Sequence, residues 1–327
     1  MRTCLLTGAT GFLGAHVARA LLARQWTVRA LVRKGERRLA ALSAAGVLPV
    51  PGDLSEETDL GAAAAGVEAI VHVAGVTKAR TLEEYREVNS RGTARLVEAA
   101  RRTAPDALFL AVSSQAAAGP ARGGRTVEEQ DLPRPVSWYG VSKFEGEESV
   151  ARDWPGPWIV VRPSVVYGPG DRALLLLFRA AARGWLPVPS GRTRVQLIRA
   201  ERAAEAIVRA AERRDLSGRR GFLCDPAPVS IAELSRSIAD LPPRRPVLLP
   251  VPRALVALAG LAETALETVS RRSRAFNADK AREILAGDWL CDGAPLLRDL
   301  GLSQPPPLSQ DLRATWEWYR REGWVVL

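Results

Sequence analysis

Residue types that build metal sites and disulfide frameworks are scarce in this chain of 327 residues. The only histidines are His16 and His72, and no histidine and cysteine residues stand at the spacing of metal ligands. The three cysteines, Cys4, Cys224 and Cys291, are scattered and odd in number. These shortages argue against a structural metal and against a disulfide framework, and they fit a reducing cytoplasm.

The chain also lacks a long hydrophobic run. The apolar stretch LVALAGLA at 255–262 is far shorter than the ~20 residues that span a bilayer. The N-terminus, MRTCLLTGATGFLG, has no apolar core followed by a small-residue cleavage site. We therefore expect a cytoplasmic protein with no stable membrane insertion and no signal peptide.

Positive charge is abundant but spread out. The chain has 46 basic and 36 acidic residues, which gives a formal net charge of +10. The arginines are distributed over many expected helices. The sequence shows no DNA-recognition helix, no zinc-binding module and no basic surface interleaved with aromatic residues, so we expect no nucleic-acid partner. The lysines are rare: Lys34, Lys78, Lys143 and Lys280.

The order of elements predicts a doubly wound α/β fold. A hydrophobic fraction of 47% and a charged fraction of 25% are typical of a globular protein with a full core. In the first half, short β-rich runs alternate with amphipathic helical patterns, which is typical of a parallel sheet covered on both faces. The β-rich runs are 3–7, 27–32, 47–50, 68–73, 107–113 and 158–162, and the clearest helices are 12–24 and 82–104.

This regularity ends near residue 165. We predict a dinucleotide-binding Rossmann domain over 1–165, to which residues 200–224 return, and a smaller, mostly helical substrate domain over 166–327. The later segments are helical patterns at 173–184 and 200–213, a short strand within 219–225, and Pro-rich stretches at 242–252 and 305–307.

A glycine-rich turn follows the first expected strand. Gly8, Gly11 and Gly14 lie in TGATGFLG, between that strand and the first helix. The missing side chains let the backbone approach a pyrophosphate, which binds free N–H groups at the positive end of a helix. We therefore predict a dinucleotide site, with cofactor contacts from Gly8, Thr10, Gly11, Phe12, Leu13 and Gly14.

The end of the second strand indicates which dinucleotide binds. An NAD site usually has an acidic residue there, whereas this chain has LVRKGERR. Arg33 can pair bidentately with a 2′-phosphate, and Lys34, Arg37 and Arg38 add positive charge. We favour NADP(H) over NAD(H), although an arginine-rich surface is a competing explanation of the same residues.

Further cofactor contacts are expected where the third and fourth strands end. Asp53 can accept a hydrogen bond from the adenine amino group, and HVAG at 72–75 offers small residues that let a cofactor lie close to the backbone. His72 has no evident carboxylate partner, and we interpret it as a packed strand residue. The contacts expected here are Asp53, Leu54, Val73, Ala74 and Gly75.

The stretch WYGVSKFEGE at 138–147 separates Tyr139 and Lys143 by four residues. On a helix these two side chains face the same way. Tyrosine titrates near ~10, and an ammonium beside it, together with an oxidised nicotinamide ring, would favour the phenolate and lower that pKa. Alone, the pair is typical of an exposed helix face, but downstream of a glycine turn we interpret it as a proton-transfer centre.

The chain resembles an extended short-chain dehydrogenase/reductase of the NAD(P)-dependent epimerase/dehydratase superfamily. Its dihydroflavonol-reductase and 3β-hydroxysteroid-dehydrogenase-like branch is the most similar. The motifs lie within residues 7–171, and the remainder matches more loosely. In the family's order they are TGATGFLG, GDL, HVAG, NSRGTARLVEAA, VSSQAAAG, YGVSK and VRPSVVYGPGD.

The resemblance implies a serine, a tyrosine and a lysine that act together. The serine maps to Ser114, with Ser113 as the alternative, and the other two map to Tyr139 and Lys143. Asn89 matches a structural asparagine that helps to hold the lysine and a proton-relaying water.

In reduction, the resemblance makes Tyr139 the proton donor to the substrate oxygen while nicotinamide delivers hydride. Lys143 would bind the nicotinamide ribose and Ser114 would hydrogen-bond the substrate oxygen. Tyr139, Lys143, Pro163 and Val166 are then also cofactor contacts, and a homodimer through the long helices is expected.

Two departures favour a carbonyl reductase or alcohol dehydrogenase acting on a small molecule. Val165 stands where sugar-nucleotide enzymes commonly have an asparagine, and Arg202 stands where a second acid is usual. A nucleotide-sugar epimerase that retains NAD is the alternative, because Arg194 can hold a substrate phosphate. The intact serine, tyrosine and lysine argue against a third reading, a non-catalytic dinucleotide sensor.

An apolar helix is expected over 254–270, followed by basic residues. We interpret its apolar stripe as core packing or a lid over a hydrophobic substrate, with an interfacial membrane helix as the alternative. Trp316, Tyr319 and Trp324 are interpreted as packing for the C-terminal helix. The stripe consists of Leu255, Leu258, Ala262, Ala265 and Val269.

Overall fold

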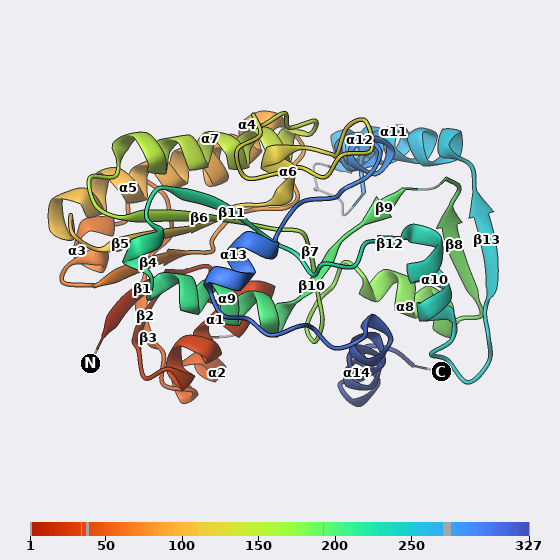
Figure 1. The fold of residues 1–327 in the computed structure, drawn as a ribbon, viewed down its shortest axis with the longest axis horizontal. Helices are drawn as coiled ribbons and strands as arrows, with labels where there is room; N and C mark the ends of the chain where they lie inside the picture. Colours follow the sequence, from red (N-terminus) through yellow and green to blue (C-terminus); the bar gives the residue numbers. More distant parts are fainter. Residues whose placement is uncertain (1, 34, 37–38, 192, 271–275, 327) are drawn as a thin grey trace.

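A computed structural model describes residues 2–33, 35–36, 39–191, 193–270 and 276–326. The central strands are β1 (Thr3–Thr7), β2 (Thr27–Val32), β3 (Leu48–Pro51), β4 (Ala69–His72), β5 (Leu108–Val112), β6 (Trp158–Pro163) and β11 (Arg219–Leu223). They form one sheet in the order β11-β6-β5-β4-β1-β2-β3, with every neighbouring pair parallel (Figure 1). The strand order reverses between β1 and β4, as in a doubly wound sheet, so the predicted fold class is confirmed.

Helices cover both faces of this sheet (Figure 1). One side has α1 (Phe12–Ala23), α2 (Leu39–Ala44) and α9 (Ala200–Ala211), and the other has α3 (Leu60–Ala64), α4 (Leu82–Arg86), η1 (Glu87–Arg91), α5 (Gly92–Thr103) and α7 (Trp138–Asp153). Alternate strand residues point to opposite faces. Cys4 and Leu6 of β1 accordingly pack in one buried cluster with α1 and α9, whereas Leu5 packs in the other with α3, α5 and α7.

The helix expected over 82–104 is continuous but contains one irregular turn. The segment η1 is a π-helical turn between α4 and α5, and it contains Asn89. Such turns are frequent at functional sites. Residues 200–224 contribute α9 and the edge strand β11, while the division of the chain at residue 165 stays a prediction.

Most of the remaining elements form a smaller layer beyond the carboxyl ends of the sheet strands. The proline-rich stretch 242–252 contains β13, a strand that the sequence analysis did not predict. Proline is tolerated there because β13 belongs to a two-stranded sheet and is an edge strand. The elements are α6 (Gln115–Ala118), β7 (Val165–Tyr167), α8 (Leu175–Ala182), β8 (Trp185–Pro189), β9 (Arg194–Val195), β10 (Leu197–Arg199), η2 (Arg214–Leu216), β12 (Val229–Ser230), α10 (Ile231–Ala239), β13 (Val247–Val251), α11 (Arg253–Ser270), α12 (Ala278–Leu285), α13 (Ala294–Asp299) and α14 (Leu308–Arg321).

Aromatic side chains hold α14 against this layer. Trp316 and Tyr319 are buried and pack on Phe178 of α8, while Trp324 stacks on Tyr319. The Tyr319 hydroxyl donates to the carbonyl oxygen of Asp171 at 2.7 Å. Their interpretation as packing residues is confirmed.

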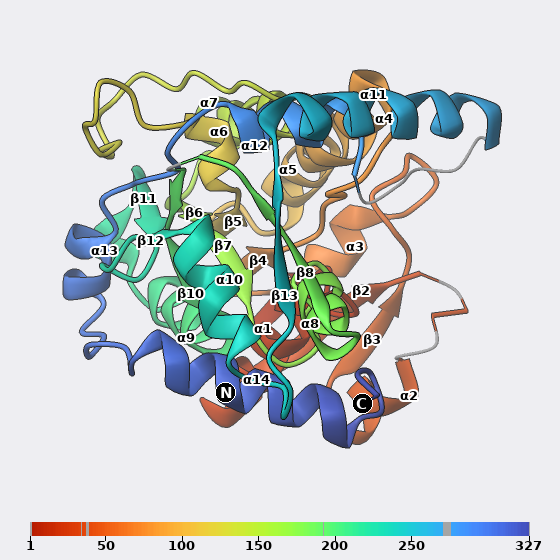
Figure 2. The same ribbon diagram turned by 90° about the vertical axis from the view of Figure 1, so that its right-hand side faces the viewer.

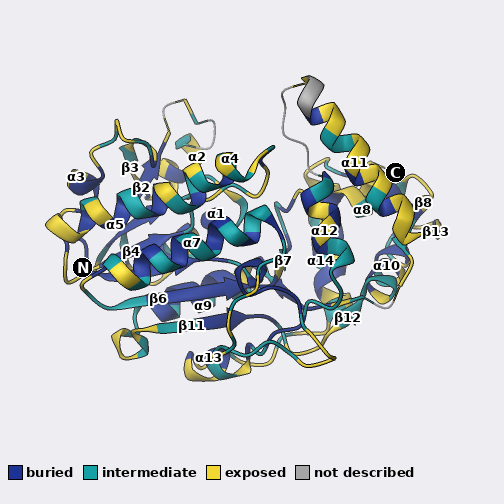
Figure 3. Ribbon diagram, turned by 90° about the horizontal axis from the view of Figure 1, so that it is seen from above, coloured by how far each residue is buried: buried dark blue, intermediate teal, exposed yellow. Residues whose placement is uncertain are grey.

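Helix α11 lies along one edge of the molecule (Figure 2) and its apolar stripe is exposed (Figure 3), so the interpretation of this stripe as core packing is wrong. Leu255 and Leu258 are 53% and 59% exposed, and Ala262 and Ala265 are exposed as well; the side chain of Val269 lies outside the described residues. The helix instead packs on α12 through its opposite side, which contains Gly260. A Cβ on Gly260 would lie 2.6 Å from the Ala281 Cβ of α12, a contact that only glycine permits. None of the helices in the described ranges is long and apolar enough to cross a membrane.

Candidate functional site

The glycine turn brings the ends of β1 and β4 together. Gly8 has φ +74°, and a Cβ there would lie 2.6 Å from the backbone nitrogen of Ala74. A Cβ on Gly14 would lie 2.0 Å from the carbonyl oxygen of Gly8. The Thr7 hydroxyl also accepts from the Ala74 N–H at 3.1 Å. A side chain at either glycine would force this turn apart. The residues after β1 and after β4 that we predict to contact the cofactor therefore lie side by side.

The first turn of α1 faces this surface. Gly11 is its N-cap, no side chain caps it, and its first turn has no acidic residue. The first amide groups of a helix have no intrahelical acceptor and lie at its positive end. The 168–171 loop closes one side, because His16 contacts the Pro169 carbonyl oxygen at 2.9 Å. The half-buried side chains of Thr10, Phe12 and Leu13 line the same turn.

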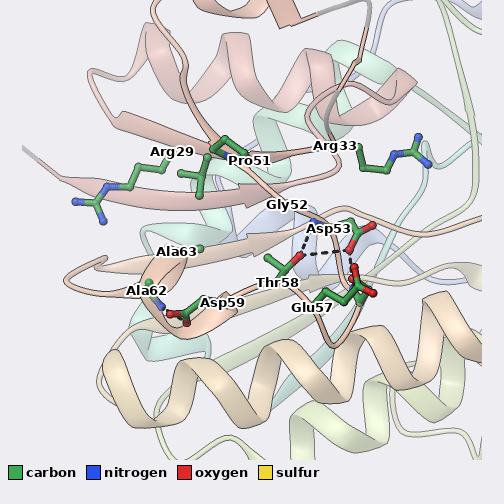
Figure 4. A pocket seen from close by; sticks show the side chains of 12 residues that line it. Arg29, Arg33, Pro51, Gly52, Asp53, Glu57, Thr58, Asp59, Ala62 and Ala63 are labelled. Carbon is green, nitrogen blue, oxygen red and sulfur yellow. Dashed lines mark hydrogen bonds between the residues drawn. The ribbon is translucent and has the colours of Figure 1, made fainter.

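A groove of about 930 Å³ opens beside the ends of β2 and β3 (Figure 4). Arg33 and Asp53, which we predict to contact the adenosine end of the cofactor, both line this groove. The Arg33 guanidinium is 73% exposed and 3.8 Å from the Glu36 carboxylate. Hydrogen bonds from Ser55 lower the pKa of Asp53.

Not every predicted residue at this end is available to a ligand. The Leu54 side chain is 8% exposed and belongs to the core beside Gly92, so only its backbone borders the groove region. Lys34, Arg37 and Arg38 lie outside the described residues.

The predicted catalytic side chains meet where β5 ends. Tyr139 and Lys143 lie on α7, and the buried Lys143 ammonium donates to the Val112 carbonyl oxygen at 2.7 Å. Ser114 is the N-cap of α6, and its hydroxyl accepts from the Ala116 N–H at 3.2 Å. The Ser114 side chain also lies near enough to the Tyr139 phenol to lower its pKa.

Burial sets the protonation of this cluster. It raises the pKa of Tyr139 to about 12, a hydrogen bond from Ser114 opposes the rise, and the Glu283 carboxylate adds to it. Burial lowers the pKa of Lys143 to about 8, and Glu147 opposes that shift. The lowering of the Tyr139 pKa expected from Lys143 is therefore not found in the protein by itself. Near neutral pH the phenol is protonated and able to donate.

Asn89 ties the end of β4 to α7. It is 1% exposed, and its amide nitrogen donates to the Val76 carbonyl oxygen and the Ser142 hydroxyl, both at 3.0 Å. Its side-chain oxygen accepts from the Val76 N–H at 2.8 Å. A Cβ on Gly75 would lie 2.9 Å from that oxygen and 3.5 Å from the Lys143 nitrogen. Asn89 thus connects the segment after β4 to Ser142, the residue that precedes Lys143 on α7.

Two buried hydroxyls lie unpaired at the same edge of the sheet. Among the described residues, the Ser113 and Ser164 Oγ atoms have no hydrogen-bond partner. They follow the adjacent strands β5 and β6 directly. Buried polar atoms are rarely left unpaired in native proteins, so a ligand with polar groups fits here. With the uncapped α1 and the glycine turn, these atoms fit a nicotinamide dinucleotide lying across the strand ends, next to the buried Pro163 and half-buried Val166.

The sequence profile of the NAD dependent epimerase/dehydratase family matches residues 4–221 of this chain. The chain belongs to this family. Extended short-chain dehydrogenase/reductases share it, so the resemblance noted from the motifs is confirmed. The two sections of the site described above, glycine turn and catalytic cluster, both lie within the matched residues.

Named relatives within the family include reductases. The chain is 36% identical to the ceramide reductase of Caulobacter vibrioides, over 98% of this chain and 95% of that protein. It is 34% identical to the 4-hydroxy-2-methyl-3-oxo-4-farnesyl-3,4-dihydroquinoline-1-oxide ketoreductase of Stigmatella aurantiaca, over 71% of this chain and 70% of that protein. The chain is thus an enzyme of the NAD(P)-dependent oxidoreductase and epimerase type, as predicted.

Solved structures share the whole fold. MoeE5 in complex with UDP-glucose and NAD has a TM-score of 0.77 and 23% sequence identity, covering 98% of this chain and 99% of that one. At this identity the likeness shows the family's architecture, including the smaller C-terminal layer, and nothing finer.

Two carboxylates of α12 that the sequence analysis missed hold the start of the catalytic helix. Asp279 accepts from the Trp138 N–H at 2.9 and 3.1 Å and from the Tyr139 N–H at 3.4 Å. Glu283 accepts from the Ser137 hydroxyl at 2.6 Å. They lie about 140 residues further along the chain, so no local pattern marks them. These contacts fix the position of Tyr139 from the C-terminal layer.

Arginines that sequence reasoning linked to substrate are already paired. Arg194 donates to the Asp288 carboxylate at 2.9 and 2.7 Å, and Arg202 forms an ion pair with Asp225 at 2.8 Å. The suggestion that Arg194 holds a substrate phosphate therefore requires breaking an existing pair. His72 is buried, contacts Thr7 and Thr93 through its two ring nitrogens, and burial lowers its pKa to about 3. It is a neutral packed residue, as interpreted.

Proposed function

We propose that this enzyme reduces a carbonyl group of an apolar small molecule, with NADPH as the hydride source and Tyr139 as the proton donor. The meeting of Tyr139, Ser114 and the buried Lys143 where β5 ends is the observation that carries the proposal. Reduction adds hydride to the carbonyl carbon and a proton to its oxygen, giving an alcohol. A phenol whose pKa is about 12 supplies that proton and is then reprotonated from solvent.

The other residues position and polarise the substrate. Ser114, whose side chain lies beside the phenol, is placed to donate to the same carbonyl oxygen. Lys143 is placed to bind the nicotinamide ribose, and Asn89 holds its helix in place. The bound dinucleotide supplies the hydride itself.

Two observations support an apolar carbonyl over a sugar nucleotide. The relatives include a ceramide reductase and a ketoreductase of a farnesyl-bearing quinoline oxide. Arg194 and Arg202 are engaged by carboxylates rather than free for a diphosphate. The epimerase alternative rests on the fold shared with MoeE5 in complex with UDP-glucose and NAD. A purified protein that retains NAD and interconverts sugar nucleotides without net oxidation would favour that alternative, whereas consumption of added NADPH with ketones supports reduction.

Replacing Arg33 by serine should raise the KM for NADPH about tenfold and change that for NADH little, because a charge-assisted hydrogen bond to the 2′-phosphate is lost. Initial rates with each nucleotide measure this. Arg29 is the matched control, since it lines the same groove but donates to the Ala65 carbonyl oxygen at 2.8 Å. Equal effects on both nucleotides would contradict the preference for NADP(H).

The value of kcat/KM for reduction should fall above pH about 8. Burial lowers the pKa of Lys143 to about 8, so the ammonium that orients the ribose is lost as pH rises through that value. Comparing the pH–rate profiles of the wild type and of Lys143→Arg from pH ~6 to ~10 tests this, because the arginine stays charged over that whole range. Any activity that this variant keeps should lack the alkaline fall, and a wild-type profile that is flat up to pH ~10 would contradict the role given to Lys143.

We also propose that the enzyme is a cytoplasmic homodimer. The three cysteines are free and buried, which suits a reducing compartment. Light scattering on the purified protein would measure the oligomeric state, and fractionation of cells would measure the location.

A further inference from the structure

The outward face of α11 is an uninterrupted apolar surface. Leu255, Leu258, Leu261 and Leu266 are between 48% and 60% exposed. The alanines between them, at 254, 259, 262 and 265, are exposed as well. We call these eight residues the α11 face. Monomeric globular proteins rarely expose contiguous apolar surface of this kind unless it binds something.

Apolar exposure continues into the strand that precedes the helix. Leu248 and Leu249 of β13 are 36% and 44% exposed, and β13 ends one residue before α11 begins. Figure 2 shows α11 lying along one edge of the molecule, with β13 leading up to it. The α11 face is therefore reachable by a broad, flat partner without displacing any described element.

The charges around the α11 face fit a negatively charged partner. Arg253 opens the helix and is exposed, while Glu267 is buried on the opposite side and Glu263 is half-buried. In the sequence, Arg271, Arg272 and Arg274 follow the helix, outside the described residues. An apolar helix face with basic residues near its ends suits the boundary between lipid headgroups and acyl chains of an anionic bilayer.

The buried side of α11 leads directly to the reaction centre. The Ala278 N–H of α12 donates to the Thr264 hydroxyl at 2.9 Å, and Gly260 packs on Ala281. From α12, Asp279 and Glu283 hold the first residues of α7, where Tyr139 lies. A partner bound to the α11 face is therefore separated from α7, which carries Tyr139, only by α11 and α12.

We propose that the α11 face docks on an anionic lipid bilayer and that the enzyme takes its apolar carbonyl substrate from that surface. The docking stands on the α11 face alone, whereas the source of substrate rests on the proposed reductase function. Within the described residues no helix, α11 included, is long and apolar enough to cross a membrane, and the proposed contact is therefore with one leaflet.

Co-sedimentation of the full chain with lipid vesicles tests the docking. The protein should bind vesicles containing phosphatidylglycerol, bind phosphatidylcholine vesicles more weakly, and lose part of its binding as NaCl is raised. Leu258→Asp combined with Leu261→Asp should weaken binding at least ~tenfold, since two leucines no longer enter the interface. Leu132→Asp is the matched control, because Leu132 is 78% exposed but lies in the loop before α7 and not on α11.

Two further measurements separate this proposal from the proposed function. Reduction of a water-soluble ketone without vesicles should be equal in the double variant and the wild type, and far-UV circular dichroism should show that both are folded. Reduction of a long-chain ketone embedded in vesicles should fall at least ~tenfold in the double variant, in step with the lost binding.

Failure of the wild-type protein to bind either kind of vesicle would overturn the docking proposal. The proposed reductase function would be unaffected, because it is tested by reduction of the water-soluble ketone. A double variant that changes from dimer to monomer in light scattering, with no change in vesicle binding, would overturn the docking proposal too. That outcome would make the α11 face an interface between copies of the chain.

Discussion

Replacing Tyr139 by phenylalanine should lower kcat for ketone reduction by about 10³-fold. The phenol is the group placed to donate the proton, and general acid catalysis contributes roughly 10²–10⁴-fold. Phenylalanine keeps the ring, so the packing against Tyr85, with ring centroids 6.0 Å apart, should survive. Loss of NADPH absorbance with a panel of aliphatic and aromatic ketones measures the rate, and nucleotide fluorescence measures binding. The dissociation constant of NADPH should change far less than kcat, because the glycine turn is untouched.

Tyr85→Phe is the control for this experiment. Tyr85 is buried beside Tyr139, and its hydroxyl donates to the Thr77 carbonyl oxygen at 3.3 Å rather than toward Ser114. Removing that hydroxyl should leave most of the activity. If Tyr139→Phe kept more than about a tenth of the wild-type kcat, another group would have to be the proton donor.

The sequence predicted the parts of the site whose geometry is local. A strand, a glycine turn and a helix N-terminus are contiguous, so Gly8, Gly11 and Gly14 can be placed without knowing the rest of the fold. Tyr139 and Lys143 are likewise one helical turn apart. Ser114 was assigned from the family resemblance, because its approach to Tyr139 joins two segments that are distant in the sequence.

What the sequence did not predict depends on contacts distant in the chain. Asp279 reaches the first turn of α7 only because α12 folds back onto it, and nothing near Asp279 in the sequence indicates that partner. The pKa of Tyr139 rises because of burial, a property of the assembled protein that spacing does not contain.

The α11 helix shows the limit of periodicity most clearly. The pattern located the stripe that contains Leu255 and Leu258, but a period of 3.6 does not say whether a stripe faces the core or the solvent. Here Gly260 decides, because its missing side chain lets the opposite face pack closely on Ala281. A small-residue face can thus be the buried one when a neighbouring helix approaches closely.

The largest effect on stability should come from Arg162, which the sequence placed in a motif but not in an ion pair. Arg162 of β6 and Glu147 of α7 are each 1% exposed, and their charged groups lie 2.6 Å apart. Arg162→Met leaves the Glu147 carboxylate buried, with Arg220 at 3.9 Å and the Lys143 ammonium as a further nearby charge. Breaking a buried pair typically costs ~3–5 kcal/mol, and Arg220 offsets part of that, so we expect the free energy of unfolding to fall by about 3 kcal/mol. Urea denaturation followed by circular dichroism measures it.

An ion pair on the protein surface, which also has its glutamate on α7, provides the matched comparison. Arg86 and Glu145 also lie 2.6 Å apart, but their side chains are 37% and 30% exposed. Arg86→Met should therefore cost no more than about 1 kcal/mol. Replacing both buried partners, Arg162→Met with Glu147→Leu, should recover most of the loss, because no unpaired charge then stays in the interior. Similar costs for the Arg162 and Arg86 variants would show that the buried carboxylate is solvated or neutralised by other means. The double variant should also lower the pKa of Lys143 further, since Glu147 opposes the effect of burial on that lysine, and the alkaline fall in kcat/KM should then begin at a lower pH.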